Sequence, residues 1–131
     1  MRILLADHHA QPRWALKVLL EEEPDFDLIG EAADVCDLLA LAEKHTPDLV
    51  LVDSALPGDS IENMIARLHE LEPIPIVIVM SSEIENSRVS LKAGADAFVS
   101  KGDQPGWLLE KLHNYAKQVK LKEDANRDKR P

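Results

Sequence analysis

The sequence predicts a single α/β domain built on a parallel sheet. Short apolar runs typical of buried strands recur along the 131 residues, and a segment with helical spacing follows each of them. Strands that alternate with helices pair in parallel and leave helices on both faces of the sheet. The length suits one domain with a sizeable core and is too short for two ordinary ones.

Five segments are predicted as strands. The clearest is residues 49–52, where four consecutive apolar residues indicate a strand buried on both faces. The other four are expected at residues 3–6, 26–32, 76–80 and 97–99.

Five helices are predicted after these strands. They run from about Trp14 to a stop at Pro24, from a cap at Asp34 to about residue 45, over residues 60–71, over residues 84–93 with Gly94 as the cap, and from Pro105 to about Leu121. Residues 1–121 therefore form the predicted domain. Residues 122–131 are charged and lack apolar periodicity, so we expect a frayed tail or the start of a linker there.

The composition and charge of the chain argue against several classes of function. The net charge is −9, and because residues 117–131 contribute +3, the preceding 116 residues carry −12. An acidic body repels phosphate backbones, so direct binding of nucleic acid by this domain is not expected. The longest apolar run, residues 76–80, is far below the roughly 20 residues of a membrane helix. One cysteine, Cys36, excludes an internal disulfide, and a cytoplasmic location is expected.

Polar residues follow the ends of the predicted strands. They are Asp7 with His8, Asp53, Ser81 and Lys101. The carboxyl ends of parallel strands meet at one edge of a sheet, where open α/β folds bind ligands. Such a set suits a phosphoryl group: Asp53 is a candidate nucleophile that would form an acyl phosphate, a carboxylate-bound Mg²⁺ would neutralise charge, and Lys101 would contact phosphoryl oxygens.

Four segments in this order resemble the receiver domain of two-component response regulators, over essentially the whole chain to about Leu121. The segments are ILLADHH, PDLVLVDSALPG, IPIVIVMSS and LKAGADAFVSK. The similarity is greatest to the class with a LuxR-type helix-turn-helix output, a transcription-regulating segment that is not expected within these residues. The resemblance implies a flavodoxin-like (βα)5 fold with sheet order 2-1-3-4-5.

The resemblance also implies residue roles. Asp53 would be the phosphoacceptor for a histidine kinase, and Ser81 and Lys101 would bind phosphoryl oxygens. Asp7, Asp53 and the backbone carbonyl of Ala55 would hold Mg²⁺. Such a protein signals in a phosphorelay and is not an enzyme.

Signalling is expected to use one face of the domain. The resemblance places it on the fourth helix (84–93), the fifth strand (97–99) and the fifth helix (from Pro105), which would favour homodimerisation or release an output domain. Phe98 would be the switch residue on this face, with a plain core aromatic as the alternative. For Ser81, the alternative is a cap of the fourth helix.

His8 is the main departure from the family pattern. It occupies the position of a second acid that commonly binds Mg²⁺, and imidazole is a poor ligand for this hard cation. The substitution is either tolerated at the pocket rim or the mark of a pseudo-receiver, an interaction module that is not phosphorylated. A transition-metal site using both His8 and His9 is a third hypothesis, against which the alternation of strand side chains argues. A phosphatase is disfavoured because no segment is long enough for a substrate cap.

Overall fold

The computed structural model describes residues 1–128 and contains the predicted parallel sheet. Its strands are β1 (Arg2–Ala6), β2 (Asp27–Ala32), β3 (Leu49–Asp53), β4 (Ile76–Ser81) and β5 (Ala97–Ser100). They pair in parallel in the order β2-β1-β3-β4-β5. The predicted flavodoxin-like order is therefore confirmed, with β3 at the centre of the sheet.

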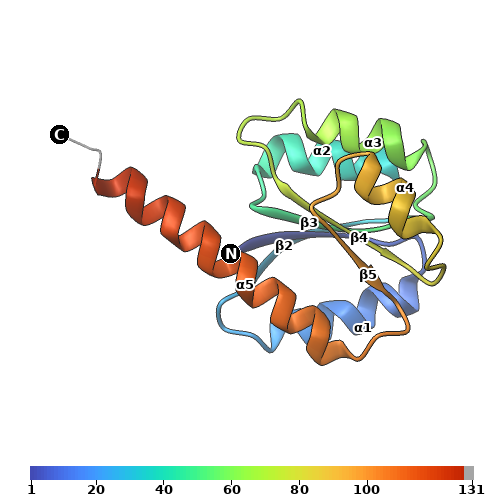
Figure 1. Cartoon of the computed structure of the whole chain (residues 1–131), viewed down its shortest axis with the longest axis horizontal. Coiled ribbons are helices and arrows are strands. Elements are labelled where there is room, and N and C mark those ends of the chain that lie inside the picture. Colours follow the sequence, from blue (N-terminus) through green and yellow to red (C-terminus); the bar gives the residue numbers. More distant parts are fainter. Residues whose placement is uncertain (129–131) are drawn as a thin grey trace.

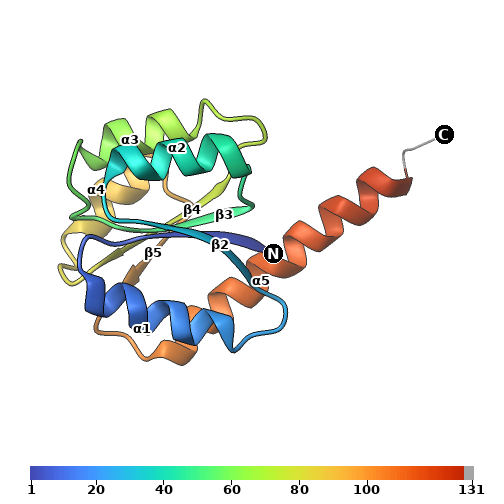
Figure 2. The ribbon, with the colours of Figure 1, turned by 180° about the vertical axis from the view of Figure 1, so that it is seen from behind.

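Helices cover both faces of the sheet. They are α1 (Ala10–Glu21), α2 (Val35–His45), α3 (Ile61–Leu68), α4 (Asn86–Lys92) and α5 (Pro105–Asp128). Figures 1 and 2 show α1 and α5 on one face and α2, α3 and α4 on the other. Although α5 has 24 residues, no helix within residues 1–128 is apolar enough to cross a membrane.

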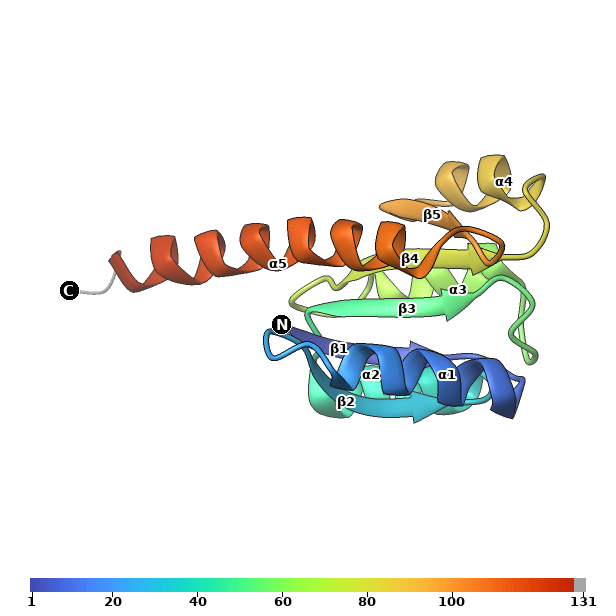
Figure 3. The same ribbon diagram turned by 90° about the horizontal axis from the view of Figure 1, so that it is seen from below.

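The C-terminal helix is longer than the apolar pattern predicted. Residues 122–128, expected to be a frayed tail or the start of a linker, continue α5 as a helix that projects past the sheet (Figure 3). They are therefore not frayed, and the start of a linker stays a prediction. Leu121 itself is 68% exposed, so helix formers such as lysine, glutamate and alanine sustain this part without an apolar face to bury. The last residues of the predicted tail, 129–131, lie outside the described part of the chain.

Two core layers enclose the sheet, one on each face. Val50 and Val52 of β3 pack in the layer under α2 and α3, whereas Leu49 and Leu51 pack in the layer with α1 and α5. All five residues of β3 are buried, as its unbroken apolar run predicted. Asp53 is the last residue of this strand, so the position of the strand at the centre of the sheet buries a carboxylate.

Gly94 follows α4 at a φ of 110°, a backbone conformation that residues with a Cβ rarely adopt. A Cβ at this position would also lie 2.7 Å from Cε1 of His69. At Gly106, in the first turn of α5, a Cβ would meet no atom within 4 Å. An added methyl group would therefore be strained at Gly94 and would be accommodated at Gly106.

We predict that Gly94→Ala lowers the free energy of unfolding by at least about 1 kcal/mol, because a side chain is strained at positive φ and contacts His69. The matched Gly106→Ala should be neutral or stabilising by up to about 1 kcal/mol, since alanine favours the helix. Urea unfolding of both variants measures the difference. Equal effects of the two substitutions would contradict the prediction.

Candidate functional site

The strand-end residues converge at the carboxyl edge of the sheet. Asp7 directly follows β1, Asp53 ends β3 and Ser81 ends β4, and each of the three is at most 4% exposed. Lys101 follows β5 and reaches back across the edge to Asp7, 94 residues earlier in the chain. The parallel sheet thus brings together side chains that are far apart in sequence.

Lys101 joins the two buried carboxylates. Its Nζ lies 2.8 Å from Oδ2 of Asp7 and 3.2 Å from Oδ2 of Asp53. Partial burial lowers the pKa of the Lys101 ammonium, but the two carboxylates outweigh this effect and the pKa is raised above its usual value. Buried charges are costly unless they are paired, so this ammonium is the counter-ion of both aspartates.

The turn after β3 fixes the other side of the Asp53 carboxylate. The backbone amide of Ala55, an exposed residue, donates to Oδ1 of Asp53 at 3.2 Å, while Lys101 contacts Oδ2. The amide of Ser54 donates to the carbonyl of Met80, which ties this turn to β4. The two carboxylate oxygens of Asp53 are therefore held by different groups.

The Ser81 hydroxyl is engaged within the loop that leads to α4. It accepts hydrogen bonds from the backbone amide of Glu83 and from Nδ2 of Asn86, both at 3.0 Å. The same Asn86 amide lies 3.4 Å from the Ser54 hydroxyl. Ser81 thus braces the turn before α4, whose N-cap residue Glu85 makes no side-chain cap. Asn86 was not singled out by the sequence, because no motif links it to a hydroxyl five residues earlier.

Phe98 lies on β5, half-buried against the core layer under α2 and α3. It also lines a surface hollow between α4 and α5, together with Ile84, Leu91 and Tyr115. Its packing fits a core aromatic, and its place beside this hollow is what a switch residue would need; the switch role stays a prediction.

His9, rather than His8, is the histidine beside the carboxylates. His8 is exposed and stacks edge-on against the His9 ring, with centroids 5.4 Å apart. Nδ1 of His9 lies 3.6 Å from Oδ1 of Asp7, which also accepts a hydrogen bond from the His9 backbone amide. The strand alternation used in the sequence argument does not apply here, because β1 ends at Ala6 and His9 is the N-cap of α1.

Three potential metal ligands result from this arrangement. One ligand atom each of Asp7, His9 and Asp53 lie within 4.8 Å of one another. The two carboxylates suit Mg²⁺, the cation implied by the family resemblance, whereas an imidazole nitrogen does not. His8, which replaces the second acid of the family pattern, lies outside this group. The side chains therefore fit Mg²⁺ in part.

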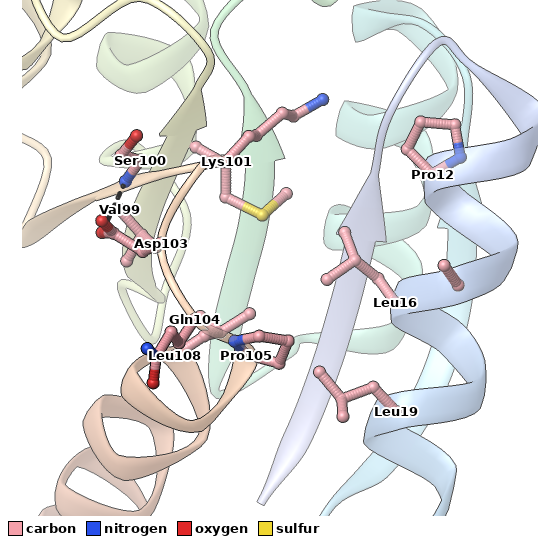
Figure 4. Close-up of a pocket in the computed structure, with 12 residues that line it drawn as sticks. Pro12, Leu16, Leu19, Val99, Ser100, Lys101, Asp103, Gln104, Pro105 and Leu108 are labelled. Carbon is pink, nitrogen blue, oxygen red and sulfur yellow. Dashed lines mark hydrogen bonds between the residues drawn. The ribbon is translucent and has the colours of Figure 1, made fainter.

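A cavity of about 300 Å³ adjoins the site between α1 and α5 (Figure 4). Apolar side chains such as Leu16, Leu19 and Leu108 line it, and neither Asp7 nor Asp53 does. Lys101 belongs to both places, since its stem borders the cavity while its ammonium contacts the aspartates.

Comparison with known proteins identifies the family. Residues 3–113 match the family described as the response regulator receiver domain. The chain is 35% identical over 116 residues to the nitrate/nitrite response regulator protein NarL of Escherichia coli, covering 87% of this chain and 54% of NarL. It is 32% identical over 120 residues to the transcriptional regulatory protein LiaR of Bacillus subtilis, covering 89% of this chain and 56% of LiaR. The chain thus spans about half the length of these relatives.

Solved structures agree. A LuxR-family two-component response regulator from Aurantimonas superposes with a TM-score of 0.82 at 24% identity, covering 89% of this chain and 85% of that chain, and it supports the fold. The signal receiver domain of a NarL regulator from Mycobacterium tuberculosis gives a TM-score of 0.81 at 25% identity, covering 88% of this chain and 95% of that chain. The family match, the identities and the sheet order agree, and the chain belongs to the response regulator receiver domains, among those of the NarL and LuxR type.

Proposed function

We propose that this domain accepts a phosphoryl group on Asp53 from a histidine kinase. An oxygen of the Asp53 carboxylate attacks phosphorus, the bond from phosphorus to the imidazole nitrogen of the kinase's phosphohistidine breaks, and an acyl phosphate forms. The observation that carries the proposal is the setting of Asp53, a buried carboxylate at a sheet edge with the Lys101 ammonium 3.2 Å away. An ammonium so placed neutralises charge on phosphoryl oxygens.

The remaining roles follow from what surrounds Asp53. Asp7 and Asp53, with the backbone carbonyl of Ala55, would hold a Mg²⁺ ion, which supplies charge neutralisation to the phosphoryl oxygens. The Ser81 hydroxyl would turn from Asn86 to a phosphoryl oxygen. Asn86 is the first residue of α4, so this exchange of partners would pass the chemical change to that helix.

The face formed by α4, β5 and α5 is the proposed signalling surface. Exposed apolar side chains gather on α4 and the turn before it: Ile84, Val89 and Leu91. Together with the hollow beside Phe98, they offer a surface for a second copy of the domain. Regulation of transcription, which the names of several relatives state, would require a longer protein with a DNA-binding segment, in which this domain would be the regulatory part.

A pseudo-receiver is the second candidate. The observation in its favour is that His8 is exposed and lies outside the group formed by Asp7, His9 and Asp53. Because His8 occupies the position of an acid in the family pattern, the site lacks a carboxylate that would favour metal binding and hence phosphorylation. Such a module would bind partners through the same fold and would never be phosphorylated.

Incubation with acetyl phosphate and Mg²⁺ should add one phosphoryl group to the protein, observed as a gain in intact mass, because Asp53 is a positioned carboxylate nucleophile. Asp53→Asn should show no gain. His8→Asp should increase the labelled fraction, since it adds a negative charge beside the two carboxylates and so strengthens their attraction for Mg²⁺. No labelling of either the wild-type protein or His8→Asp would contradict phosphotransfer and favour the pseudo-receiver.

Replacing the counter-ion should destabilise the fold. We expect Lys101→Met to lower the free energy of unfolding by about 2–3 kcal/mol, less than the roughly 3–5 kcal/mol of fully buried pairs, because Lys101 is 25% exposed. Adding Asp53→Asn should recover part of this loss by removing one unpaired charge. Urea unfolding measures both, with the exposed Lys92→Met of α4 as the control; an equal loss in Lys92→Met would contradict the counter-ion role.

Phosphorylation should produce a dimer through the signalling surface. Light scattering with size-exclusion chromatography should show an increased mass after acetyl phosphate treatment. Leu91→Glu, which puts a charge among the exposed apolar residues of α4, should abolish the dimer without abolishing labelling of Asp53. Val18→Glu, an exposed apolar position on α1 across the sheet, is the matched control. If Val18→Glu abolished the dimer instead, the assignment of the surface would be wrong.

A further inference from the structure

We propose that this domain binds a first-row transition-metal dication such as Co²⁺ through Asp7, Asp53 and the imidazole of His9. The proposal rests on the same two aspartates as the proposed function, but it adds a nitrogen ligand and concerns the choice of metal. His9 is not part of the metal set that the family resemblance implies. The sequence raised it only as one of a histidine pair, whereas the structure groups it with the two aspartates and without His8.

The geometry of the three side chains suits a single ion. Ligands at about 2.0–2.2 Å from a metal lie roughly 3–3.5 Å from one another. Nδ1 of His9 and Oδ1 of Asp7 are 3.6 Å apart, and the three ligand atoms lie within 4.8 Å of one another. Small side-chain rotations therefore suffice to close the set.

His9 is free to make such a rotation. Its side chain is 65% exposed, and although it is the N-cap residue of α1, its ring makes no capping hydrogen bond. Asp7 is fixed by comparison, because its Oδ2 is held by Lys101 and its Oδ1 accepts from the His9 backbone amide. Oδ1 is the oxygen that faces the imidazole, so an ion between them leaves the Asp7–Lys101 pair in place.

The net charge of the site and the types of its ligands determine which metal ions it prefers. Two carboxylates and one ammonium leave a net negative charge that attracts a dication. An imidazole nitrogen contributes little to Mg²⁺, which prefers oxygen, but is a good ligand for Co²⁺, Zn²⁺ and their neighbours. His9 therefore strengthens binding of the transition metals and leaves Mg²⁺ affinity unchanged.

The test compares the binding of Co²⁺ with that of Mg²⁺, and the effect of replacing His9 with that of replacing His8. Calorimetric titration of the untagged protein with Co²⁺ alone and with Mg²⁺ alone gives each affinity, and the visible absorption of Co²⁺ reports its ligands. We expect His9→Ala to weaken Co²⁺ by about 10-fold or more with Mg²⁺ affinity unchanged, a loss of at least the size seen for residues that only support metal ligands. His8→Ala, its exposed neighbour outside the ligand group, should leave both affinities unchanged.

Asp53→Asn distinguishes this site from a surface histidine pair. Loss of Co²⁺ binding in Asp53→Asn supports the proposal. Co²⁺ binding that survives Asp53→Asn but is lost in His8→Ala would overturn it, as would equal effects of His9→Ala on both metals or on neither. Failure of the phosphoacceptor proposal is separate, because it would show as absent mass labelling while the Co²⁺ titrations keep the expected pattern.

Discussion

The ammonium of Lys101 lies between the carboxylates of Asp7 and Asp53, and the carboxyl edge of the sheet depends on this contact. Two like charges about 4 Å apart repel by about 4 kcal/mol at the effective dielectric of a protein surface, and more where water is excluded. The fold places both aspartates at the ends of central strands, where solvent cannot screen them. A cation at this edge is therefore a structural requirement as well as a chemical one.

In the proposed phosphotransfer, this requirement would link the stability of the fold to signalling. In the unphosphorylated domain, Lys101 partly neutralises the two carboxylates, and a bound metal ion would neutralise them further. A phosphoryl group on Asp53 would add negative charge at the same edge, so Lys101 and the neighbouring hydroxyl would be drawn to new partners. Because the Ser81 hydroxyl is shared with Asn86 at the start of α4, a local electrostatic change has a direct connection to one helix. A two-state arrangement of this loop would be the physical basis of the proposed switch.

The two histidines after β1 affect the metal chemistry of this site in different ways. Replacing an acid by His8 removes one negative charge from the edge, which weakens its attraction for a dication relative to a site with three acids. His9 partly compensates by placing a nitrogen beside Asp7. The site is thus distinguished by the kinds of ligand it offers as much as by its charge.

The sequence by itself determined the order and type of the elements, because buried parallel strands and amphipathic helices have local periodicities that need no tertiary information. It also placed Asp7, Asp53, Ser81 and Lys101 at one edge, since the ends of parallel strands meet there. The helical residues 122–128 were missed because apolar periodicity was the criterion, whereas residues 122–127 are exposed and their helix depends on helix propensity.

Only the tertiary structure decided which side chains contact one another at the edge. His9 faces Asp7 while His8 faces solvent, because the chain has left the strand and turned into the N-cap of α1, where strand alternation no longer directs side chains. Likewise, Asn86 meets Ser81 through the path of the loop before α4. Loop directions of this kind depend on packing among distant segments, and a local pattern does not contain them.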